Sequence, residues 1–512
     1  MKNLLACILV VVACGFATKV NPEPKKITKL FFPEVELDIN TPAFRKAKGF
    51  TNYDELIAYL TELQQAHPEV MKISYIGESQ KGKQIPLVTL HKGTTDDKVR
   101  VWLQGGLHGD EMASTEGVLY MLDRILNDAQ YASLLDKLEI RLVPMANIDG
   151  YEKESRYAAN GLDLNRDHTK LMVKESVSLK QAFSDFKAEV AIDFHEYRPY
   201  RKDFTQLSTY GVTSRYDAMF MYSGNLNVPA NVRTYTKDRF VTNAELVLKD
   251  AGIAYRDYVT TTKMHGDIHF NQGSNNARSS ATSYALSNCI SSLIEIRGVG
   301  IGRTSFKRRI RSTFLIGMSY LKTASENGTE IKAVLAKGEQ AQQDAVVKST
   351  KTAEQQSITF IDIETCKEIQ LESTVYNASK TLPKLTRVRP TAYVLDKEQS
   401  ALADKLKVLG LTVQNLATDK TVEVETYTVS TYQKEGEKYE GVYRQTVTTD
   451  VATEQKTLAA GSYIVYTNQK NASLATEVLE PEAPNSFVTF HVLSTAQGEK
   501  LPIYRYLKTE KL

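Results

Sequence analysis

The sequence predicts an α/β domain, in which a mixed sheet is flanked by helices, followed by a separate, mainly β domain. Two observations predict this arrangement. Up to about residue 330, short apolar runs typical of buried strands alternate with stretches of helical periodicity. After residue 356 the chain becomes rich in Thr, Val and Tyr with a period of two, which is typical of strands. A chain of 512 residues is also longer than one domain of roughly 100–200 residues.

The first domain is expected over residues 46–330. It begins with a helix, because the apolar residues of LIAYLTEL (56–63) fall at helical spacing. Strands and helices then alternate, which favours a parallel or mixed sheet. The expected elements are strands at 99–104 (VRVWLQ), 138–146 (LEIRLVPMA), 189–194 (EVAIDF) and 291–298 (SSLIEIRG), and a helix at 112–126 (MASTEGVLYMLDRIL).

A linker and an accessory domain are expected after the first domain. Residues 331–356 are polar, rich in Lys, Gln and Ala and poor in glycine, which predicts a linking helix. The accessory domain is expected over residues 357–512 and is mainly β. Its strand-rich segments are 421–433 (TVEVETYTVSTYQ), 440–453 (EGVYRQTVTTDVAT) and 461–469 (GSYIVYTNQ), with a strand–helix–strand unit at 392–416.

The N-terminus has the features of an export signal. Lys2 precedes an apolar run over residues 4–13, which is too short to span a bilayer and fits the core of a secretory signal. Two processing sites fit: VVAC, ending at Cys14, resembles a bacterial lipoprotein box, and GFA, ending at Ala17, suits ordinary signal peptidase. We therefore expect a signal peptide over residues 1–17, a leader segment over 18–45 and an exported protein that is periplasmic, secreted or a cell-envelope lipoprotein.

The charge balance limits the classes of binding partner, and the cysteine content limits the disulfides that the sequence predicts. Lys and Arg number 64 against 61 Asp and Glu, a net charge of +3, which gives no case for nucleic acid or an anionic membrane as a partner. Contact with a membrane is expected only through a lipid on Cys14, and the sequence indicates no oligomeric state. Outside the signal only Cys289 and Cys366 remain, in different expected domains, so a disulfide framework is not expected.

Polar residues gather at the carboxyl ends of the predicted strands, where open α/β sheets place their ligand sites. His108 and Glu111 follow the strand at 99–104, and His195 and Glu295 lie near the ends of two later strands. Two histidines and a carboxylate form a set that zinc takes in catalytic sites. The His-x-x-Glu pair alone is weak, because roughly 0.5 accidental matches are expected in a chain with eight histidines. Taken alone, each histidine is more readily interpreted as a core or loop residue than as a metal ligand.

Two acidic residues extend this set. Asp163 is a candidate for fixing the tautomer of a ligand histidine by accepting its other N–H. Glu295 lies in an apolar strand, and an unpaired buried carboxylate is costly. Either an ion pair, for example with Arg297, or a catalytic role would account for it.

Six ordered motifs resemble those of the zinc carboxypeptidases of the M14 type. The resemblance covers about residues 50–325 and predicts the corresponding fold. The pieces are HGDE (108–111), NIDG (147–150), Arg156, DLNRD (163–167), DFHEY (193–197) and IEIRG (294–298).

The resemblance implies a metal site and a base. His108, Glu111 and His195 would hold one zinc ion, with Asp163 as a supporting partner. Glu295 would be the general base that takes a proton from the zinc-bound water and delivers it to the leaving amine.

It also implies how the substrate is bound. Arg156 would stabilise the oxyanion, and Asn165 and Arg166 would grip the free carboxylate at the C-terminus of a peptide. Tyr284 is the nearest tyrosine before Glu295 and is the candidate for the mobile tyrosine of the family, although it lies only eleven residues upstream. The accessory domain lies outside the resemblance.

The predicted function is that of an exported zinc metallocarboxypeptidase, which removes C-terminal residues from peptides, cell-wall peptides included. Two alternatives remain open. One is a zinc deacylase or amidase acting on N-acyl amino acids or cell-wall peptides. The other is an inactive peptide-binding protein on a peptidase scaffold.

Overall fold

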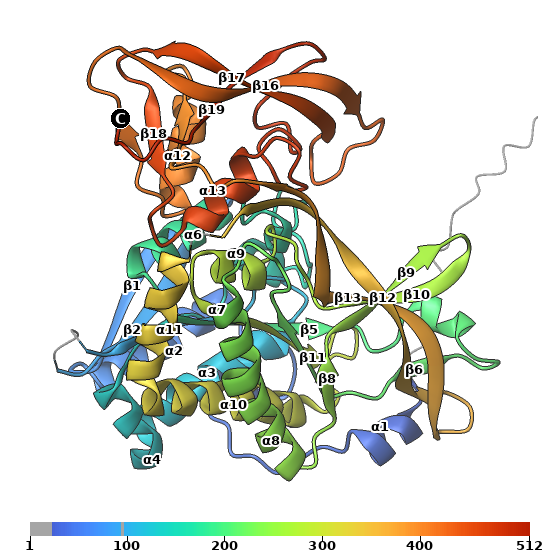
Figure 1. Cartoon of the computed structure of the whole chain (residues 1–512). Helices are drawn as coiled ribbons and strands as arrows, with labels where there is room; N and C mark the ends of the chain where they lie inside the picture. The colour runs from blue at the N-terminus through green and yellow to red at the C-terminus, as the bar shows by residue number, and fades with distance from the viewer. Residues whose placement is uncertain (1–22, 94–96, 342) are drawn as a thin grey trace, which may run out of the picture.

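The computed structural model describes residues 23–93, 97–341 and 343–512. The expected signal peptide, with Cys14 and Ala17, lies outside the described residues. The first domain is built on an eight-stranded mixed sheet, as the sequence predicts (Figure 1). In sheet order its strands are β1 (Met71–Glu78), β2 (Gln84–Leu90), β4 (Leu138–Val143), β3 (Val99–Gln104), β5 (Val190–Tyr197), β11 (Ile290–Arg297), β7 (Ala218–Tyr222) and β8 (Tyr255–Asp257).

The four central strands β4, β3, β5 and β11 run parallel to one another. The β1–β2, β2–β4 and β7–β11 pairs are antiparallel, which makes the sheet mixed, and β8 at its edge pairs in parallel with β7. Because the central strands share one direction, their carboxyl ends meet at one edge of the sheet. The loops after β3 and β4 and the ends of β5 and β11 therefore lie together.

Helices cover both faces of this sheet. The helix α2 begins at a capping box, in which Asn52 accepts from the N–H of Glu55 and the Glu55 carboxylate accepts from the N–H of Asn52, both at 2.9 Å. The longer helices of the domain are α2 (Tyr53–Ala66), α3 (Met112–Asn127), α6 (Lys174–Phe186), α8 (Thr242–Asp250), α9 (Ser280–Leu286), α10 (Phe306–Glu326) and α11 (Gly328–Gln340). Shorter turns of helix are α4 (Ala129–Ala132), η2 (Ser133–Asp136), α5 (Ile148–Tyr151), η3 (Leu164–Arg166), η4 (Lys202–Gln206), α7 (Ala230–Tyr235) and η5 (Thr236–Val241).

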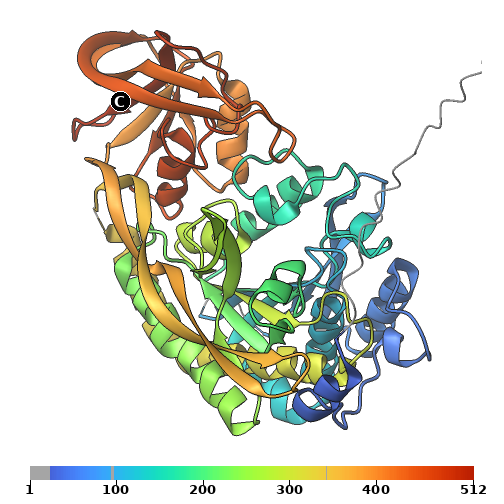
Figure 2. The same cartoon turned by 90° about the vertical axis from the view of Figure 1, so that its right-hand side faces the viewer.

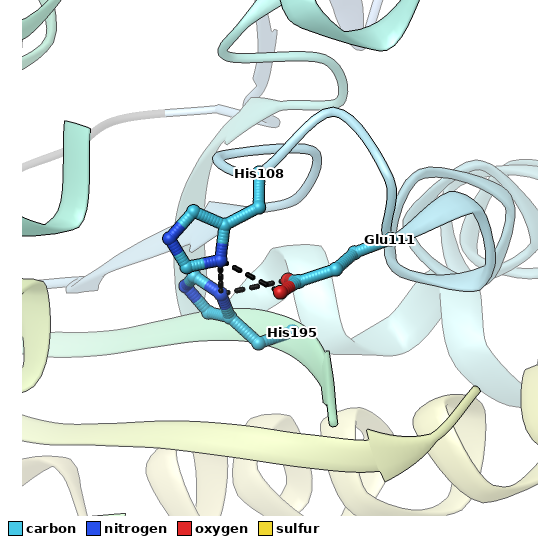
Figure 3. Close-up of side chains that lie close together, drawn as sticks. All are labelled: His108, Glu111 and His195. Atoms are coloured by element: carbon cyan, nitrogen blue, oxygen red, sulfur yellow. Dashed lines mark hydrogen bonds and ion pairs between the residues drawn. The ribbon is translucent and has the colours of Figure 1, made fainter. Parts of the chain in front are cut away.

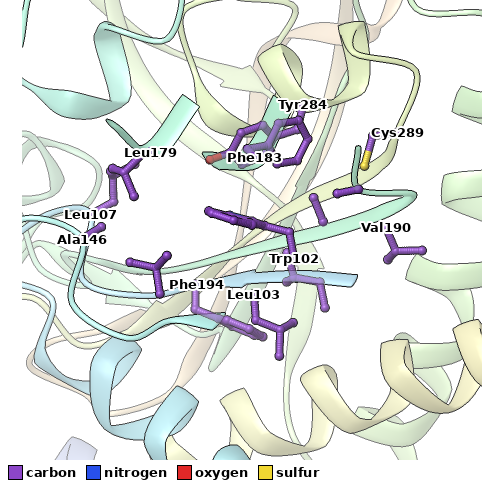
Figure 4. Close-up of a cluster of buried hydrophobic side chains, with 14 of the residues drawn as sticks. Trp102, Leu103, Leu107, Ala146, Leu179, Phe183, Val190, Phe194, Tyr284 and Cys289 are labelled. Atoms are coloured by element: carbon purple, nitrogen blue, oxygen red, sulfur yellow. The ribbon is translucent and has the colours of Figure 1, made fainter. Parts of the chain in front are cut away.

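The core lies on both sides of the central strands (Figure 4). Trp102 points to one side, where its ring meets Phe183 of α6 edge-on at 5.8 Å. Phe194 points to the other side, towards α3 and α10, where Gly317 leaves room for its ring. Alternate residues of β5 thus face opposite layers, so that His195 lies on the side of α6 and α9.

A second sheet, of five strands, crosses the boundary that the sequence predicts between the linker and the accessory domain. The expected helix at 331–356 ends at Gln340, and β12 begins at Ala345. Strands β12 and β13 form a long hairpin, and β13 pairs in parallel with β10 of the first domain. The hairpin, which includes the first residues of the expected accessory domain, therefore belongs to the wall of the first domain. The strand order is β6 (Val212–Ser214), β12 (Ala345–Asp362), β13 (Glu368–Arg387), β10 (Asp267–Gln272) and β9 (Val259–Met264).

The C-terminal domain follows the hairpin and is seated on the first domain beside α6 and α9 (Figures 1 and 2). Its six strands form one antiparallel sheet, which confirms the expected mainly β region. Helices α12 (Ser400–Val408) and α13 (Ala472–Leu479) face α6 and α9 respectively. The strand order is β15 (Gln414–Asn415), β18 (Tyr463–Tyr466), β14 (Ala392–Leu395), β19 (Lys500–Tyr506), β16 (Lys420–Lys434) and β17 (Gln445–Leu458).

The described part of the expected leader segment, residues 23–45, packs on the first domain. It contains α1 (Lys25–Phe31) and η1 (Pro42–Phe44). Glu23 forms a buried ion pair with Arg297, whose guanidinium lies 3.8 Å from the centre of the Phe32 ring. Among the described residues, no helix is both long enough and apolar enough for a membrane span.

Candidate active site

The loop after β3 carries His108 and Glu111, and it is held tightly by the NIDG segment. Gly109 lies against the backbone of Gly150, where any Cβ would collide. Glu111 occupies the position before the first residue of α3. The glycine therefore allows the close approach that turns both side chains of the loop towards β5.

His108, Glu111 and His195 converge on one point (Figure 3). His108 Nδ1 lies 2.7 Å from Glu111 Oε1, and His195 Nδ1 lies 2.8 Å from Glu111 Oε2. The two Nδ1 atoms are 3.0 Å apart. All three residues are buried, and together they form a group that could hold a metal ion.

The outer nitrogens of both rings are also bound to carboxylates. His108 Nε2 lies 3.0 Å from Asp163 Oδ1, and His195 Nε2 lies 2.8 Å from Asp193 Oδ2. If each Nε2–H donates to its aspartate, each Nδ1 presents a lone pair to the other and to Glu111. Acceptors this close repel one another unless a cation lies between them. The donor set and its tautomers therefore fit zinc.

The electrostatics favour positive charge at the same point. Burial opposes charge on the histidines, yet Glu111 raises the pKa of His108, and Asp193 and Glu111 raise the pKa of His195 well above its usual value. Burial also opposes the charge of Glu111, but the two histidines lower its pKa. The centre of the group is thus a place where a bound cation is stabilised.

Glu295 lies beside this group on the neighbouring strand. Its Cα is paired in register with that of His195 across the parallel strands β11 and β5, so both side chains leave the same face of the sheet. Burial, and after it the charge of Glu111, raises the pKa of Glu295 to about 7. Its Oε2 is buried and accepts no hydrogen bond from a described residue. Arg297, the ion-pair partner considered from the sequence, is bound to Glu23 instead.

Arg156 reaches the same centre from the loop after α5. Asn147 holds that loop, because its Nδ2 donates to the carbonyl of Arg156 at 3.3 Å. Arg156 Nε and Nη2 both donate to Asp163 Oδ2, at 3.0 and 2.9 Å, and Nη1 lies 3.7 Å from Glu111 Oε1. Asp163 thus connects the guanidinium with His108.

Asn165 and Arg166 lie on η3, directly after Asp163. The N–H of Asn165 donates to Asp163 Oδ1 at 2.8 Å, and Asn165 Oδ1 accepts from the N–H of Ser280 at 2.8 Å. Arg166 donates to the carbonyl of Asn165 at 2.8 Å, and among the described residues no carboxylate forms an ion pair with it. Its guanidinium is therefore available to an anionic ligand.

A cavity of about 420 Å³ joins these residues. His108, Arg156, Asn165, Arg166 and Glu295 all line it. The remaining wall is mixed, and its basic residues are Arg198, Arg201 and Lys351. The apolar and aromatic residues of the wall are Tyr197, Phe204, Tyr216, Met219, Met221, Tyr258, Val259, Phe270, Val299, Ile358 and Phe360.

Tyr284 is the predicted site residue that the structure does not bring to the active site, so the expectation for it is wrong. Its ring is fully buried and stacks on Phe183 with centroids 4.0 Å apart, and its hydroxyl donates to Gln104 at 3.0 Å (Figure 4). A short distance from Glu295 in sequence does not bring it near in space, because α9 turns the ring into the core. Among the tyrosines that line the cavity, Tyr258, which precedes β9, is the one whose pKa is raised by burial and then by the charge of Glu295.

Asp193 is the other residue that sequence reasoning missed. The signal was present, because residues two apart on a strand share a face, and Asp193 precedes His195 by two. Tyr258 had no such signal, since its place depends on how the second sheet packs against the first.

Known zinc carboxypeptidases are similar to this chain in sequence. A family model described as zinc carboxypeptidase, Peptidase_M14, matches residues 56–327. Carboxypeptidase 2 of Trichophyton rubrum is 30% identical over 445 residues, which cover 84% of this chain and 81% of that protein. Carboxypeptidase 2 of Trichophyton equinum is 31% identical over 446 residues, with the same coverage. A solved structure of carboxypeptidase A from Helicoverpa armigera covers 59% of this chain and 80% of its own, at 16% identity and a TM-score of 0.42.

Proposed function

The chain belongs to the zinc carboxypeptidase family and is a zinc metallocarboxypeptidase, and from this premise we propose that it is an exported enzyme in which Glu295 is the general base. One observation carries the assignment of the base. Glu295 pairs in register with His195, burial and the charge of Glu111 raise its pKa to about 7, and its buried Oε2 has no partner among the described residues. A base with a pKa near neutrality is matched to proton transfer at neutral pH.

The metal site is proposed to consist of His108, Glu111 and His195. A zinc ion held there would polarise the scissile carbonyl and lower the pKa of a water molecule. Asp163 and Asp193 hold the two rings in the tautomer that turns each Nδ1 inward.

Glu295 would move the proton. Its free oxygen accepts a proton from the attacking water as the water adds to the carbonyl. The same carboxyl then donates that proton to the nitrogen of the leaving amine. Arg156, fixed by two hydrogen bonds to Asp163, would place a guanidinium next to the developing oxyanion.

Asn165 and Arg166 would hold the C-terminal carboxylate of the substrate. Arg is suited to this task because its planar group can form two parallel hydrogen bonds with a carboxylate. The Oδ1 of Asn165 is occupied by Ser280, which leaves its Nδ2 to donate to the same anion.

This clamp predicts a preference for free C-termini. Charge-assisted hydrogen bonds contribute about 1.5–3 kcal/mol, so a C-terminally amidated peptide should be cut at least about tenfold more slowly in kcat/KM than its free-acid twin. Arg166→Ala should abolish most of that difference. Mass spectrometry of products from the paired peptides measures both. Equal cleavage of the two peptides by the wild-type enzyme, or cleavage of internal bonds first, would indicate an amidase or an endopeptidase.

The cavity wall also predicts a preference for apolar C-terminal side chains. Three acidic residues line the wall, of which Glu196 is paired with Arg309 and Glu295 is the proposed base, so only Asp110 is left to meet a cation. Burying a Leu or Phe side chain contributes roughly 1.5–3 kcal/mol. Peptides that end in Leu or Phe should therefore be cut at least about tenfold faster in kcat/KM than peptides that differ only in ending in Arg or Lys. Faster cleavage of the basic peptides would contradict this preference and would show that Asp110 or another acidic group binds the terminal side chain.

Export is proposed from the N-terminal sequence. The apolar run over residues 4–13 and the small residues after it support a signal, and they are compatible with lipidation at Cys14 or with cleavage after Ala17. Mass spectrometry of the native N-terminus distinguishes a lipidated Cys14 from a free Thr18.

A further inference from the structure

A loop of the C-terminal domain contacts the segment around Asp163. This segment carries Asn165 and Arg166, which would hold the substrate carboxylate, and Asp163 itself, which binds His108. This loop, residues 435–444, connects β16 and β17 and will be called the β16–β17 loop. In it, Oε2 of Glu440 accepts a hydrogen bond from the backbone N–H of Asp163 at 3.1 Å. Gly441 follows, and a Cβ on it would lie 3.2 Å from Leu162. The contact therefore joins two residues that are 277 positions apart in the chain.

The position of Asp163 matters to three groups of the proposed active site. One carboxylate oxygen binds His108 Nε2 and the N–H of Asn165, and the other binds the guanidinium of Arg156. Asp163 is 4% exposed, so few water molecules can replace a lost partner of its N–H. A rotation of the peptide between Leu162 and Asp163 would move the carboxylate with it.

Other contacts hold the two domains together without Glu440. Lys405 donates to the carbonyls of Lys170 and Leu171, at 2.7 and 2.8 Å. Ser184 of α6 donates to the carbonyl of Val408 at 3.0 Å. In addition, the guanidinium of Arg278 lies over the rings of Tyr439 and Phe490 and donates to Asn485. Loss of one carboxylate in the β16–β17 loop should thus leave the domain docked.

We propose that Glu440 is a positioning residue for the active site, supplied by the C-terminal domain: it fixes Asp163, and through Asp163 it orients His108 and Arg156. The proposal rests on the proposed function of that site. It assigns a role to a domain that lies beyond the part matched by the zinc carboxypeptidase model. The alignments with the Trichophyton proteins cover 84% of this chain, so they, unlike the family model, extend past residue 387 into that domain.

Three variants of the full chain test it. Glu440→Met keeps the length of the side chain and removes the acceptor, whereas Glu440→Gln keeps an oxygen that can accept from Asp163. Glu437→Ala is the matched control, because Glu437 is an exposed acid of the same loop. Three quantities are measured for each variant. Zinc affinity is determined by competition with a chelator, and kcat is determined at saturating zinc. Hydrogen exchange of the Asp163 amide is followed in the zinc-free protein.

Glu440→Met should lose about tenfold in zinc affinity and about tenfold in kcat, at the lower end of the 10–100-fold known for partners of metal ligands. Exchange of the Asp163 amide should be faster. Glu440→Gln and Glu437→Ala should stay within about twofold of wild type. The proposal is overturned if Glu440→Met matches wild type in zinc affinity and amide exchange, or if Glu440→Gln falls as far as Glu440→Met.

Two features of this design keep the outcome clear. If Glu440→Met failed to fold, the behaviour of Glu440→Gln and the exchange of the Asp163 amide in wild type would still decide, since rapid exchange in wild type contradicts the hydrogen bond. If the wild-type chain bound zinc and cut no peptide, the proposed function would fail, while zinc affinity and amide exchange would still test the role of Glu440.

Discussion

Glu295→Gln should retain zinc and the wild-type fold, and its kcat should be lower by about 10²–10⁴-fold. Glutamine has nearly the same shape but cannot accept the proton of the attacking water. Glu295 pairs in register with the proposed ligand His195, and its Oε2 is buried beside the proposed metal site. Single-turnover kinetics with a peptide ending in Phe measures the effect, because this experiment separates the chemical step from product release.

The same assignment gives the sign of the pH dependence. A general base acts only when it is deprotonated, so kcat/KM should fall as the pH drops through the pKa of Glu295. Burial, and after it the charge of Glu111, raises that pKa to about 7 in the metal-free protein, and a bound zinc ion would lower it. The acid limb of the profile is therefore expected below pH 7.

The control for Glu295→Gln is Glu69→Gln, the same chemical change at an exposed position outside the site. It should leave kcat unchanged. A fall of less than about tenfold in Glu295→Gln would show that another group takes the proton, since a positioned base supplies at least 10²-fold.

The position of the active site could be predicted from the sequence, because several of its residues lie at or just after the carboxyl ends of strands. Parallel strands bring their carboxyl ends to one edge, so the residues after β3 and those near the ends of β5 and β11 had to meet if the sheet was parallel there. The period of two along β5 also places Asp193 and His195 on one face. What the sequence left open was the register, and it is the pairing of Glu295 with His195 that brings the base beside the ligand group.

The remaining differences come from contacts between distant segments. A linking helix is expected to continue to residue 356, but β12 begins at Ala345, and nothing in the sequence of the hairpin shows that Val375 pairs with Phe270 of the first domain. Tyr284 has the polar group expected of a cleft residue, yet its hydroxyl is satisfied by Gln104 inside the core. The contact between Glu440 and Asp163 depends on how a whole domain docks, which no local pattern encodes.

His195→Ala is expected to abolish stoichiometric zinc binding, and with it nearly all peptidase activity. The substitution removes one of three ligands from a fully buried group, and His108 and Glu111 alone leave zinc short of the three protein ligands of its catalytic sites. Metal analysis of the purified variant should find a small fraction of one zinc per chain, compared with one in wild type.

The loss of zinc must be separated from a loss of the fold, because Asp193 keeps a buried carboxylate after its partner His195 is removed. Combining His195→Ala with Asp193→Asn removes that charge, so the double variant should be folded and equally poor in zinc. A ligand that binds only the folded protein stabilises it. Added zinc should therefore raise the Tm of the wild type and of His67→Ala, a control at an exposed histidine. It should leave the Tm of both site variants unchanged. One zinc per chain in folded His195→Ala would mean that the metal is held by other residues, and the assignment of His108, Glu111 and His195 would then be wrong.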